Sequence, residues 1–352
     1  MKKIVHIIIS GSWAGSEAAA FAIANAQASH NEIYVVVKEG KQIRAKDYKN
    51  KLYNNVNLIS FEENDSLSKI IEKLPLLLPE DIEIIHTHLG AGTYIGVNIK
   101  QYLKKSKVVA HMHIRYYEEQ FKLTDGLIAV SKWQERDIPT SYRGISATVR
   151  NFVSPKKNSL THDELISQRN RFFITKNDYI FGIICRLHIE KGVDVAIRAM
   201  KLINNQNIKL IIFGTGEELE NLKLLSMNDS RIHFGGFVNG GYPYMKIFNT
   251  YISPSRCESF GISQIEAYFN EKNVIASKTY GSLDIFKNGI NNNLFEIDNE
   301  YELAELMLSA KNKNIQCNID TNVYSTEYNL PILEDFYDKV LNLNTHEDHR
   351  ND

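Results

Sequence analysis

Short apolar runs alternate with longer amphipathic segments along the first part of the chain. The runs are continuous and rich in Ile and Val, which is typical of parallel strands buried on both faces. The segments between them, such as 66–74 and 92–104, have the apolar spacing of helices. The runs predict strands at 4–9, 32–38, 56–61, 82–89, 107–113 and 126–131. This alternation of strand and helix indicates a doubly wound parallel sheet.

The same alternation returns after a polar stretch at 154–171, which we interpret as the connection between two domains. The second set of apolar runs predicts strands at 178–187, 208–214, 231–238, 248–253 and 273–277. The predicted architecture is α/β, with two doubly wound, Rossmann-like domains at 1–153 and 172–325. A terminal segment at 326–344 follows, with an amphipathic helix expected over 330–343.

The composition is that of a soluble globular protein, with 43% hydrophobic and 24% charged residues. The formal net charge of −1 over 352 residues gives no reason to expect a nucleic-acid partner. Three cysteines, Cys185, Cys257 and Cys317, have no paired spacing, as expected in a reducing cytosol. No apolar run is long enough for a signal peptide or a membrane span. We therefore expect a cytoplasmic protein, with contact at the inner face of the cytoplasmic membrane left open.

The stretch at 254–270, PSRCESFGISQIEAYFN, joins a predicted strand to a predicted helix and carries two carboxylates, Glu258 and Glu266. A helix that starts at Gly261 would present unpaired amides and a positive dipole end, which favour an anion. Carboxylates beside a bound phosphate would repel it unless they contact neutral hydroxyl groups. The stretch therefore predicts a ligand with phosphate in the middle and a sugar at each end.

Two cations follow the first strand of the second domain, Arg186 and Lys191 in R-L-x-x-x-K-G. The carboxyl ends of neighbouring parallel strands share one edge of a sheet, so we expect both near Gly261. Each charge-assisted hydrogen bond to a phosphate contributes roughly 1.5–3 kcal/mol. For these two cations alone a solvated loop is an equal alternative. No D-x-D spacing occurs, so a carboxylate pair for Mg²⁺ is not predicted.

The loop SGSWAGSE (10–17) follows the first strand and leads into a helix of small residues. It lacks the G-x-G-x-x-G pattern, so a dinucleotide fingerprint is absent. A tight turn that requires glycine explains the loop equally well.

Two histidine pairs, His86 with His88 and His111 with His113, occur at the ends of consecutive strands. Histidines at i and i+2 on a strand point to the same side, as zinc ligands could. No cysteine or acidic partner lies near them in sequence, so we predict no metal site. We expect His113 to lie in the cleft and donate a hydrogen bond, and His86 and His111 to be structural. The role of His88 stays open.

Residues 38–51, KEGKQIRAKDYKNK, carry six cations among few acids. One interpretation is a solvated loop. The other is a patch for anionic lipid head groups, where each cation contributes roughly 1 kcal/mol near a charged bilayer.

Four motifs follow one another in the second domain: R-L-x-x-x-K-G (186–192), F-G-T-G-E-E (213–218), G-G-F-V (235–238) and P-S-R-C-E-S-F-G-I-S-Q-I-E-A (254–267). The second domain, through these motifs, resembles that of retaining glycosyltransferases of the GT-B fold, family 4, whose signature is two glutamates with seven residues between them, as in Glu258 and Glu266. The first domain resembles the family more loosely, through SWAGSE, IIHTH, VSKW and VRNF. The resemblance implies two Rossmann-like domains that face a cleft, with the terminal helix crossing back to the first domain.

The resemblance also implies roles for individual residues. Arg186 and Lys191 would bind the diphosphate, Glu258 the donor-sugar hydroxyls and Glu266 the ribose hydroxyls. His113 would touch the donor sugar near the reacting carbon. The remaining implied donor contacts are Gly15, Glu17, Phe237, Val238, Ser259, Phe260, Gly261 and Ile262, and the acceptor-side candidates are Ser16, His88 and Asn151.

Three departures from the family pattern limit these roles. Ser16 replaces the second glycine of the usual pair, and Phe152 follows Asn151 where glycine is common. Gly281 opens a G-S-L-D sequence in place of G-G-x-x-E. The first two leave the acceptor side open, and the third affects the edge of the donor pocket.

The activity that the resemblance implies is retaining transfer of a sugar from a nucleoside-diphosphate sugar to a hydroxyl, with no metal requirement. The expected acceptor is a glycan or lipid-linked glycan of the cell envelope, of lipopolysaccharide, O-antigen or capsule type. Two alternatives stay open: a sugar-nucleotide epimerase of the same fold, and a non-catalytic subunit that binds a nucleotide sugar.

Overall fold

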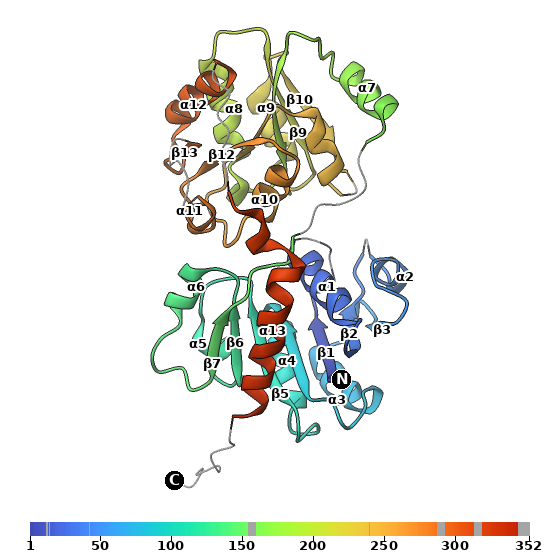
Figure 1. Cartoon of the computed structure of the whole chain (residues 1–352). Helices are drawn as coiled ribbons and strands as arrows, with labels where there is room; N and C mark the ends of the chain where they lie inside the picture. The colour runs from blue at the N-terminus through green and yellow to red at the C-terminus, as the bar shows by residue number, and fades with distance from the viewer. Residues whose placement is uncertain are drawn as a thin grey trace. The chain divides into compact units, whose positions relative to one another are not determined.

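The computed structural model describes residues 1–11, 13, 15–41, 43–153, 160–238, 240–286, 293–312 and 319–343. The chain forms two compact units (Figure 1). Unit 1 comprises Met1–Phe152 and Val323–Asp352, and unit 2 comprises Val153–Asn322. The C-terminal segment therefore belongs to the unit that the first half of the chain forms.

Unit 1 is built on a seven-stranded parallel sheet with the order β3-β2-β1-β4-β5-β6-β7. The chain first runs outward from β1 to β3 and then returns to β4 on the other side, so β1 and β4 mark the switch point of a doubly wound sheet. The strands are β1 (Lys3–Ile8), β2 (Glu32–Lys38), β3 (Asn57–Phe61), β4 (Ile84–His88), β5 (Lys107–Met112), β6 (Gly126–Ala129) and β7 (Ile145–Thr148).

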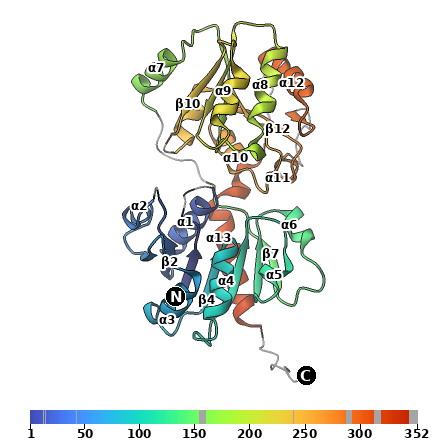
Figure 2. The ribbon, with the colours of Figure 1, turned by 180° about the vertical axis from the view of Figure 1, so that it is seen from behind.

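Helices cover both faces of this sheet, as Figures 1 and 2 show from opposite sides. Ile4 and Ile8 of β1 belong to the apolar core under α1 and α13. Val5 and Ile7 belong to the core under α3 and α4. Burial on both faces explains the continuous apolar runs in the sequence. The helices of unit 1 are α1 (Gly15–Gln27), α2 (Ala45–Lys49), α3 (Leu67–Leu77), α4 (Leu89–Ile99), α5 (Glu118–Phe121), α6 (Lys132–Asp137) and α13 (Thr326–Leu341).

The terminal helix α13 packs on the same face of the sheet as α1, through Leu333, Phe336 and Tyr337. It starts four residues before the predicted 330–343, because the Ser325 hydroxyl accepts a hydrogen bond from the amide of Tyr328 and caps the helix. Pro331 lies inside the helix, whereas the sequence pattern placed it at the start.

Unit 2 contains a six-stranded parallel sheet with the order β10-β9-β8-β11-β12-β13. Its core is formed by strand residues together with α8 and α12, which pack against each other. The strands are β8 (Tyr179–Ile184), β9 (Ile208–Phe213), β10 (Ile232–Gly236), β11 (Thr250–Ser253), β12 (Asn273–Ser277) and β13 (Leu294–Phe295). The helices are α7 (His162–Arg171), α8 (Val193–Leu202), α9 (Leu219–Ser226), α10 (Ile262–Phe269), α11 (Tyr280–Ile285) and α12 (Glu300–Asn312), with 3₁₀ turns at Ile189–Lys191 and Tyr242–Ile247. A further 3₁₀ turn, Thr321–Tyr324, spans the boundary between the two units.

Three details differ from the sequence-based prediction. The predicted connection at 154–171 is not wholly a linker, because its second half forms α7 with a capping box between Thr161 and Glu164. Strands β7 and β13 were not predicted, since both are short and carry weak apolar signals. Residues 154–159 of the connection, Cys317 and position 344 lie outside the described residues. Among the described helices, none has the length and apolarity needed to cross a membrane.

Candidate functional site

In unit 2, the loops that follow β8 and β11 meet through a glycine. Gly192 has φ of +60°, a left-handed conformation that L side chains rarely adopt. A Cβ atom built there would lie 2.0 Å from the carbonyl oxygen of Pro254, so only glycine allows this approach. The contact places Lys191 beside the stretch that contains Glu258.

Arg256 holds the two loops together. Its guanidinium donates two hydrogen bonds to the carboxylate of Asp194, at 2.9 and 2.7 Å. Its backbone amide donates to the carbonyl of Glu190 at 2.7 Å, and the side chain also pairs with Asp298. A forked guanidinium–carboxylate pair fixes orientation as well as charge. The Arg256 side chain therefore fixes the geometry of the two loops. This role was not predicted from the sequence.

Lys191 and Glu258 form an ion pair, with Nζ and Oε2 2.9 Å apart. Less than a third of either side chain is exposed, at 29% and 19%. Burial would lower the pKa of Lys191, but the negative charge of Glu258 and the hydrogen bond to it outweigh burial, and the pKa is raised. The lysine is therefore a permanent cation at this sheet edge.

The second carboxylate oxygen of Glu258 accepts a hydrogen bond from the backbone amide of Gly261 at 3.2 Å. Gly261 has φ of +86° and precedes the first residue of α10. The resemblance implied that this amide would bind phosphate. In the structure it binds Glu258, because the carboxylate three residues earlier is the nearest anion to the helix start.

Glu266 lies on α10, one turn beyond the start of the helix, and is partly buried. Burial raises the pKa of the Tyr251 hydroxyl, and the charges of Glu258 and Glu266 add to this effect. Both carboxylates thus act on one tyrosine under the site. A cavity of about 10 Å³ lies here, bordered by Cys185, Lys191, Tyr251, Glu258 and Ser263 among others.

The other predicted donor contacts of unit 2 differ in exposure. Phe260 is buried, and Ser259 and Ile262 are partly exposed. Phe237 is 74% exposed directly after β10, and Val238 next to it is partly exposed. An exposed aromatic ring at a strand end is available to stack on a planar ligand.

Arg186 is exposed after β8, and its guanidinium makes no ion pair among the residues that the structure describes. Gly281 opens the G-S-L-D sequence that departs from the family pattern. Its amide donates to the carbonyl of Glu258 at 2.9 Å, so the start of α11 borders the same loop.

In unit 1, the predicted residues at the start of α1 lie together. Gly15 is exposed, Ser16 is partly exposed and Glu17 is buried. The Ser16 hydroxyl donates to the Glu17 carboxylate at 3.0 Å. Ser12 and Ala14 of the same loop lie outside the described residues.

Five histidine rings gather on the α1 and α13 side of the unit 1 sheet. They come from β1, β4 and β5, and from the residue that follows β5 by one position. Neighbouring rings stack with centroids 4.4–5.4 Å apart. His6 was not among the residues predicted from the sequence, although a single polar residue inside the apolar run at 4–9 could have drawn attention to it. The five are His6, His86, His88, His111 and His113.

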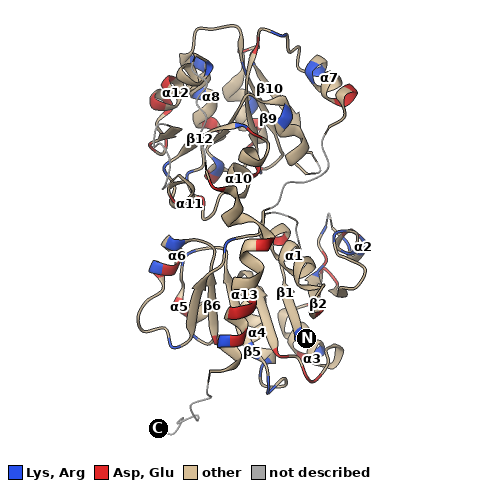
Figure 3. Ribbon diagram, in the orientation of Figure 1, with Lys and Arg blue, Asp and Glu red and all other residues tan. Residues whose placement is uncertain are grey.

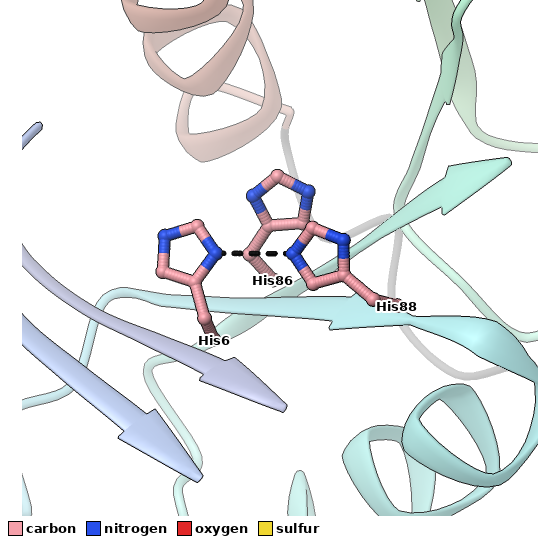
Figure 4. A group of neighbouring side chains, drawn as sticks. All are labelled: His6, His86 and His88. Atoms are coloured by element: carbon pink, nitrogen blue, oxygen red, sulfur yellow. Dashed lines mark hydrogen bonds between the residues drawn. The ribbon is translucent and has the colours of Figure 1, made fainter. Parts of the chain in front are cut away.

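His6, His86 and His88 present ring nitrogens that lie within 4.8 Å of one another (Figure 4). Nδ1 of His6 is 3.1 Å from Nε2 of His88, a hydrogen-bond distance. Three imidazole nitrogens at this spacing could hold a metal ion, and the prediction of no metal site stays a prediction.

His111 and Asn151 are both buried, with Nε2 of His111 and Oδ1 of Asn151 lacking hydrogen-bond partners among the described residues. Asn151 is close enough to raise the pKa of His111, but burial has the larger effect and lowers it well below its usual value. Asn151 was an acceptor-side candidate, and in the structure it is an interior residue of unit 1.

The basic segment 38–51 forms a loop and α2, whose Lys and Arg positions are marked in Figure 3. Several of its cations already have partners. Arg44 pairs with Glu39 and Glu63, and Lys49 donates to the carbonyl of Val56. The Lys51 ammonium lies 4.3 Å above the ring of Trp13. Gln42 of this segment lies outside the described residues.

Residues 166–323 match the family model described as Glycosyl transferases group 1. This match covers nearly all of unit 2, which therefore carries a domain of that group. The arrangement of Arg186, Lys191 and Glu258 lies within it.

Comparisons with curated proteins match more of the chain than unit 2 alone. The chain is 24% identical over 249 residues to an uncharacterized glycosyltransferase of Methanocaldococcus jannaschii. The match covers 62% of this chain and 64% of that relative. It is 22% identical over 235 residues to the O-antigen biosynthesis glycosyltransferase WclY of Escherichia coli, covering 61% and 65%. The matched region spans just under two thirds of the length of both relatives.

The fold is similar to that of Anabaena HepE, whose crystal structure contains UDP and glucose. The TM-score is 0.78 at 17% identity, and the match covers 97% of this chain and 100% of that one. The prediction of a GT-B fold with two parallel-sheet, Rossmann-like units is thereby confirmed.

Proposed function

We propose that this protein is a retaining glycosyltransferase that moves a sugar from a nucleoside-diphosphate sugar to a hydroxyl of a cell-envelope glycan or glycolipid. The observation that carries the proposal is the array of Lys191, Glu258 and the Gly261 amide at one sheet edge of a Glycosyl transferases group 1 domain.

The array contains the charges that a diphosphate sugar requires. Lys191 and Glu258 neutralise each other in this structure. A bound diphosphate would accept hydrogen bonds from the Lys191 ammonium and the Gly261 amide. The exposed guanidinium of Arg186 would supply a second positive charge. The Glu258 carboxylate, released from both partners, would then accept hydrogen bonds from sugar hydroxyls. Glu266 would do the same for the ribose, and Phe237 would stack against the base.

The proposed reaction is a front-face substitution. The bond between the anomeric carbon and the β-phosphate oxygen breaks, and a bond from the acceptor oxygen to the same face of that carbon forms. The acceptor proton passes to the departing phosphate oxygen, and the nucleoside diphosphate leaves. Arg186 and Lys191 stabilise the negative charge that develops on the diphosphate, where electrostatic stabilisation contributes most. Two protein cations at this position make a metal ion unnecessary for charge neutralisation.

The relatives suggest where to look for substrates. HepE was crystallised with UDP, so UDP-sugars are the first donors to test. The name of WclY refers to O-antigen synthesis, which supports an envelope glycan or its lipid-linked precursor as acceptor. Contact of residues 38–51 with an anionic membrane belongs to this proposal, and its support is the exposure of Lys41, Arg44 and Lys46.

A thermal-shift screen of UDP-, GDP-, ADP- and CDP-sugars tests the donor class. A ligand present at about 100 times its Kd stabilises the folded protein by about 2.7 kcal/mol. With the donor known, NMR of the product from an α-linked donor must show an α-linkage, and the rate must persist in EDTA. A donor that is isomerised without acceptor would instead identify an epimerase. Binding without turnover on any acceptor would identify a non-catalytic subunit.

A further inference from the structure

The carboxylate of Glu334, on α13, is the end of a continuous line of hydrogen bonds through the interior of unit 1. Its Oε1 accepts from the Nε2 amide group of Gln27 at 2.8 Å and from the Nδ2 amide group of Asn31 at 3.0 Å. Its Oε2 accepts from the ammonium of Lys2 at 3.3 Å. An ionised carboxylate can only accept hydrogen bonds. Gln27 must therefore turn its NH₂ group to Glu334 and its carbonyl oxygen away.

The carbonyl oxygen of Gln27 lies 2.9 Å from Nε2 of His6. A carbonyl oxygen can only accept, so His6 carries its proton on Nε2. A neutral imidazole has one donor and one acceptor nitrogen. Nδ1 of His6 therefore accepts, and its partner at 3.1 Å, Nε2 of His88, must donate. Nδ1 of His88 is then the acceptor nitrogen of its ring. It lies 3.2 Å from Nε2 of His113, which must therefore donate.

The tautomer of His113 is therefore determined by the carboxylate of Glu334. His113 donates from Nε2 to His88, which leaves the lone pair on Nδ1. We propose that Glu334 and Gln27, acting through His6 and His88, hold His113 in the Nε2–H tautomer and thereby make Nδ1 a hydrogen-bond acceptor for a ligand hydroxyl. The final clause rests on the proposed function; the tautomer does not. The four other residues are positioning residues. This proposal differs from the sequence-based expectation that His113 donates to the ligand, because here His113 accepts at Nδ1.

The proposal requires neutral rings, and the surroundings keep them neutral. Burial lowers the pKa of His6 and of His113 to about 4, and that of His88 well below its usual value. The groups that face the line from neighbouring elements are His86 on β4, His111 on β5 and Tyr337 on α13. None of these is a carboxylate that could stabilise an imidazolium next to His88.

A second line of polar contacts runs beside the first, and its first member, Tyr337, also interacts with the side chain of Gln27. The Tyr337 hydroxyl lies 2.6 Å from Nδ1 of His86, and Nε2 of His86 lies 3.3 Å from Nδ1 of His111. No carboxylate ends this line among the described residues, so its direction is not determined in the same way. Only the line that begins at Glu334 leads to His113.

The tautomer can be measured without any substrate. The full chain is labelled with ¹⁵N-histidine, and long-range ¹H–¹⁵N NMR at pH 7.5 reports which nitrogen of each ring is protonated, with single histidine substitutions for assignment. We expect His6, His88 and His113 all to be protonated on Nε2. A wild-type protein with His113 protonated on Nδ1 would overturn the proposal.

Glu334→Gln tests the cause. A glutamine at 334 can donate to Gln27, which can then turn its NH₂ group to His6 and reverse every donor along the line. We expect the His113 spectrum to shift toward the Nδ1–H tautomer. The matched control is Asp338→Asn, because Asp338 is one turn along α13 and also pairs with Lys2 at 2.9 Å, whereas the Gln27 amide donates to Glu334. An unchanged His113 tautomer in Glu334→Gln contradicts the proposal.

A swapped pair provides the rescue. In the double variant Gln27→Glu with Glu334→Gln, residue 27 is the carboxylate and must accept from Nε2 of His6. The line regains its original direction, so we expect the Nε2–H tautomer of His113 to return. A double variant that behaves like Glu334→Gln alone would show that packing, not direction, controls the ring.

Measurements of activity then test whether Nδ1 of His113 accepts a hydrogen bond from a ligand hydroxyl. We expect Glu334→Gln to lower kcat about tenfold with little change in the donor KM, and the double variant to restore it. If the tautomers behave as described while turnover is unaffected, the line holds His113 but the ring does not act on the sugar. Zinc, nickel or copper found bound in stoichiometric amount to the purified protein would also overturn the proposal, since His6 and His88 would then be ligands.

Discussion

The Nζ atom of Lys191 lies 2.9 Å from a carboxylate oxygen of Glu258, although 67 residues separate the two in the chain. The pair connects the loop after β8 with the loop after β11 and lies within the domain matched as Glycosyl transferases group 1. Each residue is the other's partner in the absence of a ligand. The two therefore have separate roles to test.

Replacing Lys191 by alanine should lower kcat by at least about 100-fold, because a cation that stabilises charge on a leaving group contributes most in the transition state. Steady-state kinetics with the donor identified by thermal shift provides the measurement. Lys223→Ala is the matched control, since among the residues that the structure describes Lys223 pairs with Glu220 alone, on the exposed surface of α9. Near-wild-type turnover in Lys191→Ala would remove the lysine from the catalytic site.

Replacing Glu258 by glutamine keeps an oxygen that can accept from the Gly261 amide but removes the negative charge. We expect the donor KM to rise about tenfold, as one or two charge-assisted hydrogen bonds to hydroxyls are weakened. The pH dependence of kcat should keep its shape, because the carboxylate binds hydroxyls and transfers no proton. A clear displacement of the pH–rate profile contradicts this role. Glu220→Gln, on the surface of α9, serves as the control.

The buried histidines should make unit 1 sensitive to acid. The pKa of His6 falls from 6.5 to about 4 on folding, so the unfolded chain binds more protons between those values. The free energy of unfolding must then decrease as pH falls below about 6.5, by about 3 kcal/mol for His6 alone once pH 4 is reached. The pKa values of four other histidines are also lowered, so these rings change the free energy of unfolding in the same direction. They are His86, His88, His111 and His113.

Tryptophan fluorescence can follow this effect in unit 1, because both tryptophans of the chain, Trp13 and Trp133, belong to it. Urea unfolding at pH 7 and pH 5 should show a lower midpoint at pH 5. Replacing exposed His30 by glutamine should leave the difference unchanged. Equal stability at the two pH values would show that these rings are charged in the folded protein.

Gly192 should tolerate alanine poorly. Left-handed backbone costs a non-glycine residue roughly 1 kcal/mol, and here the Cβ would also meet the Pro254 carbonyl at 2.0 Å. We expect Gly192→Ala to separate the two loops and lose most activity as well as stability. Gly240→Ala is the matched control, with φ of +79° but no atom within 4 Å of its Cβ. Similar activity in both variants would mean that the Gly192–Pro254 contact does not place Lys191.

Much of the fold followed from local patterns. Runs such as Glu32–Lys38 and Asn273–Ser277 were placed correctly because a strand buried on both faces must be apolar throughout. The spacing of Glu258 and Glu266 was likewise visible in sequence, since a strand, a turn and a helix are consecutive in the chain. The short β7 and the start of α13 were missed, because a four-residue strand and a serine cap ahead of Pro331 carry weak local signals.

The chain by itself therefore determined the two parallel sheets, the pair of carboxylates in the loop before α10 and on α10, and the cations after β8, all of which are local in sequence. Tertiary structure alone decided which of these groups meet. Lys191 reaches Glu258 only because β8 and β11 are neighbours in the sheet, and Glu334 reaches His6 through Gln27 only because α13 returns to pack beside α1. The continuous apolar runs conceal which face each residue occupies, since both faces are covered. The direction of the histidine line, which depends on that face and on a carboxylate from the end of the chain, could not be obtained from sequence.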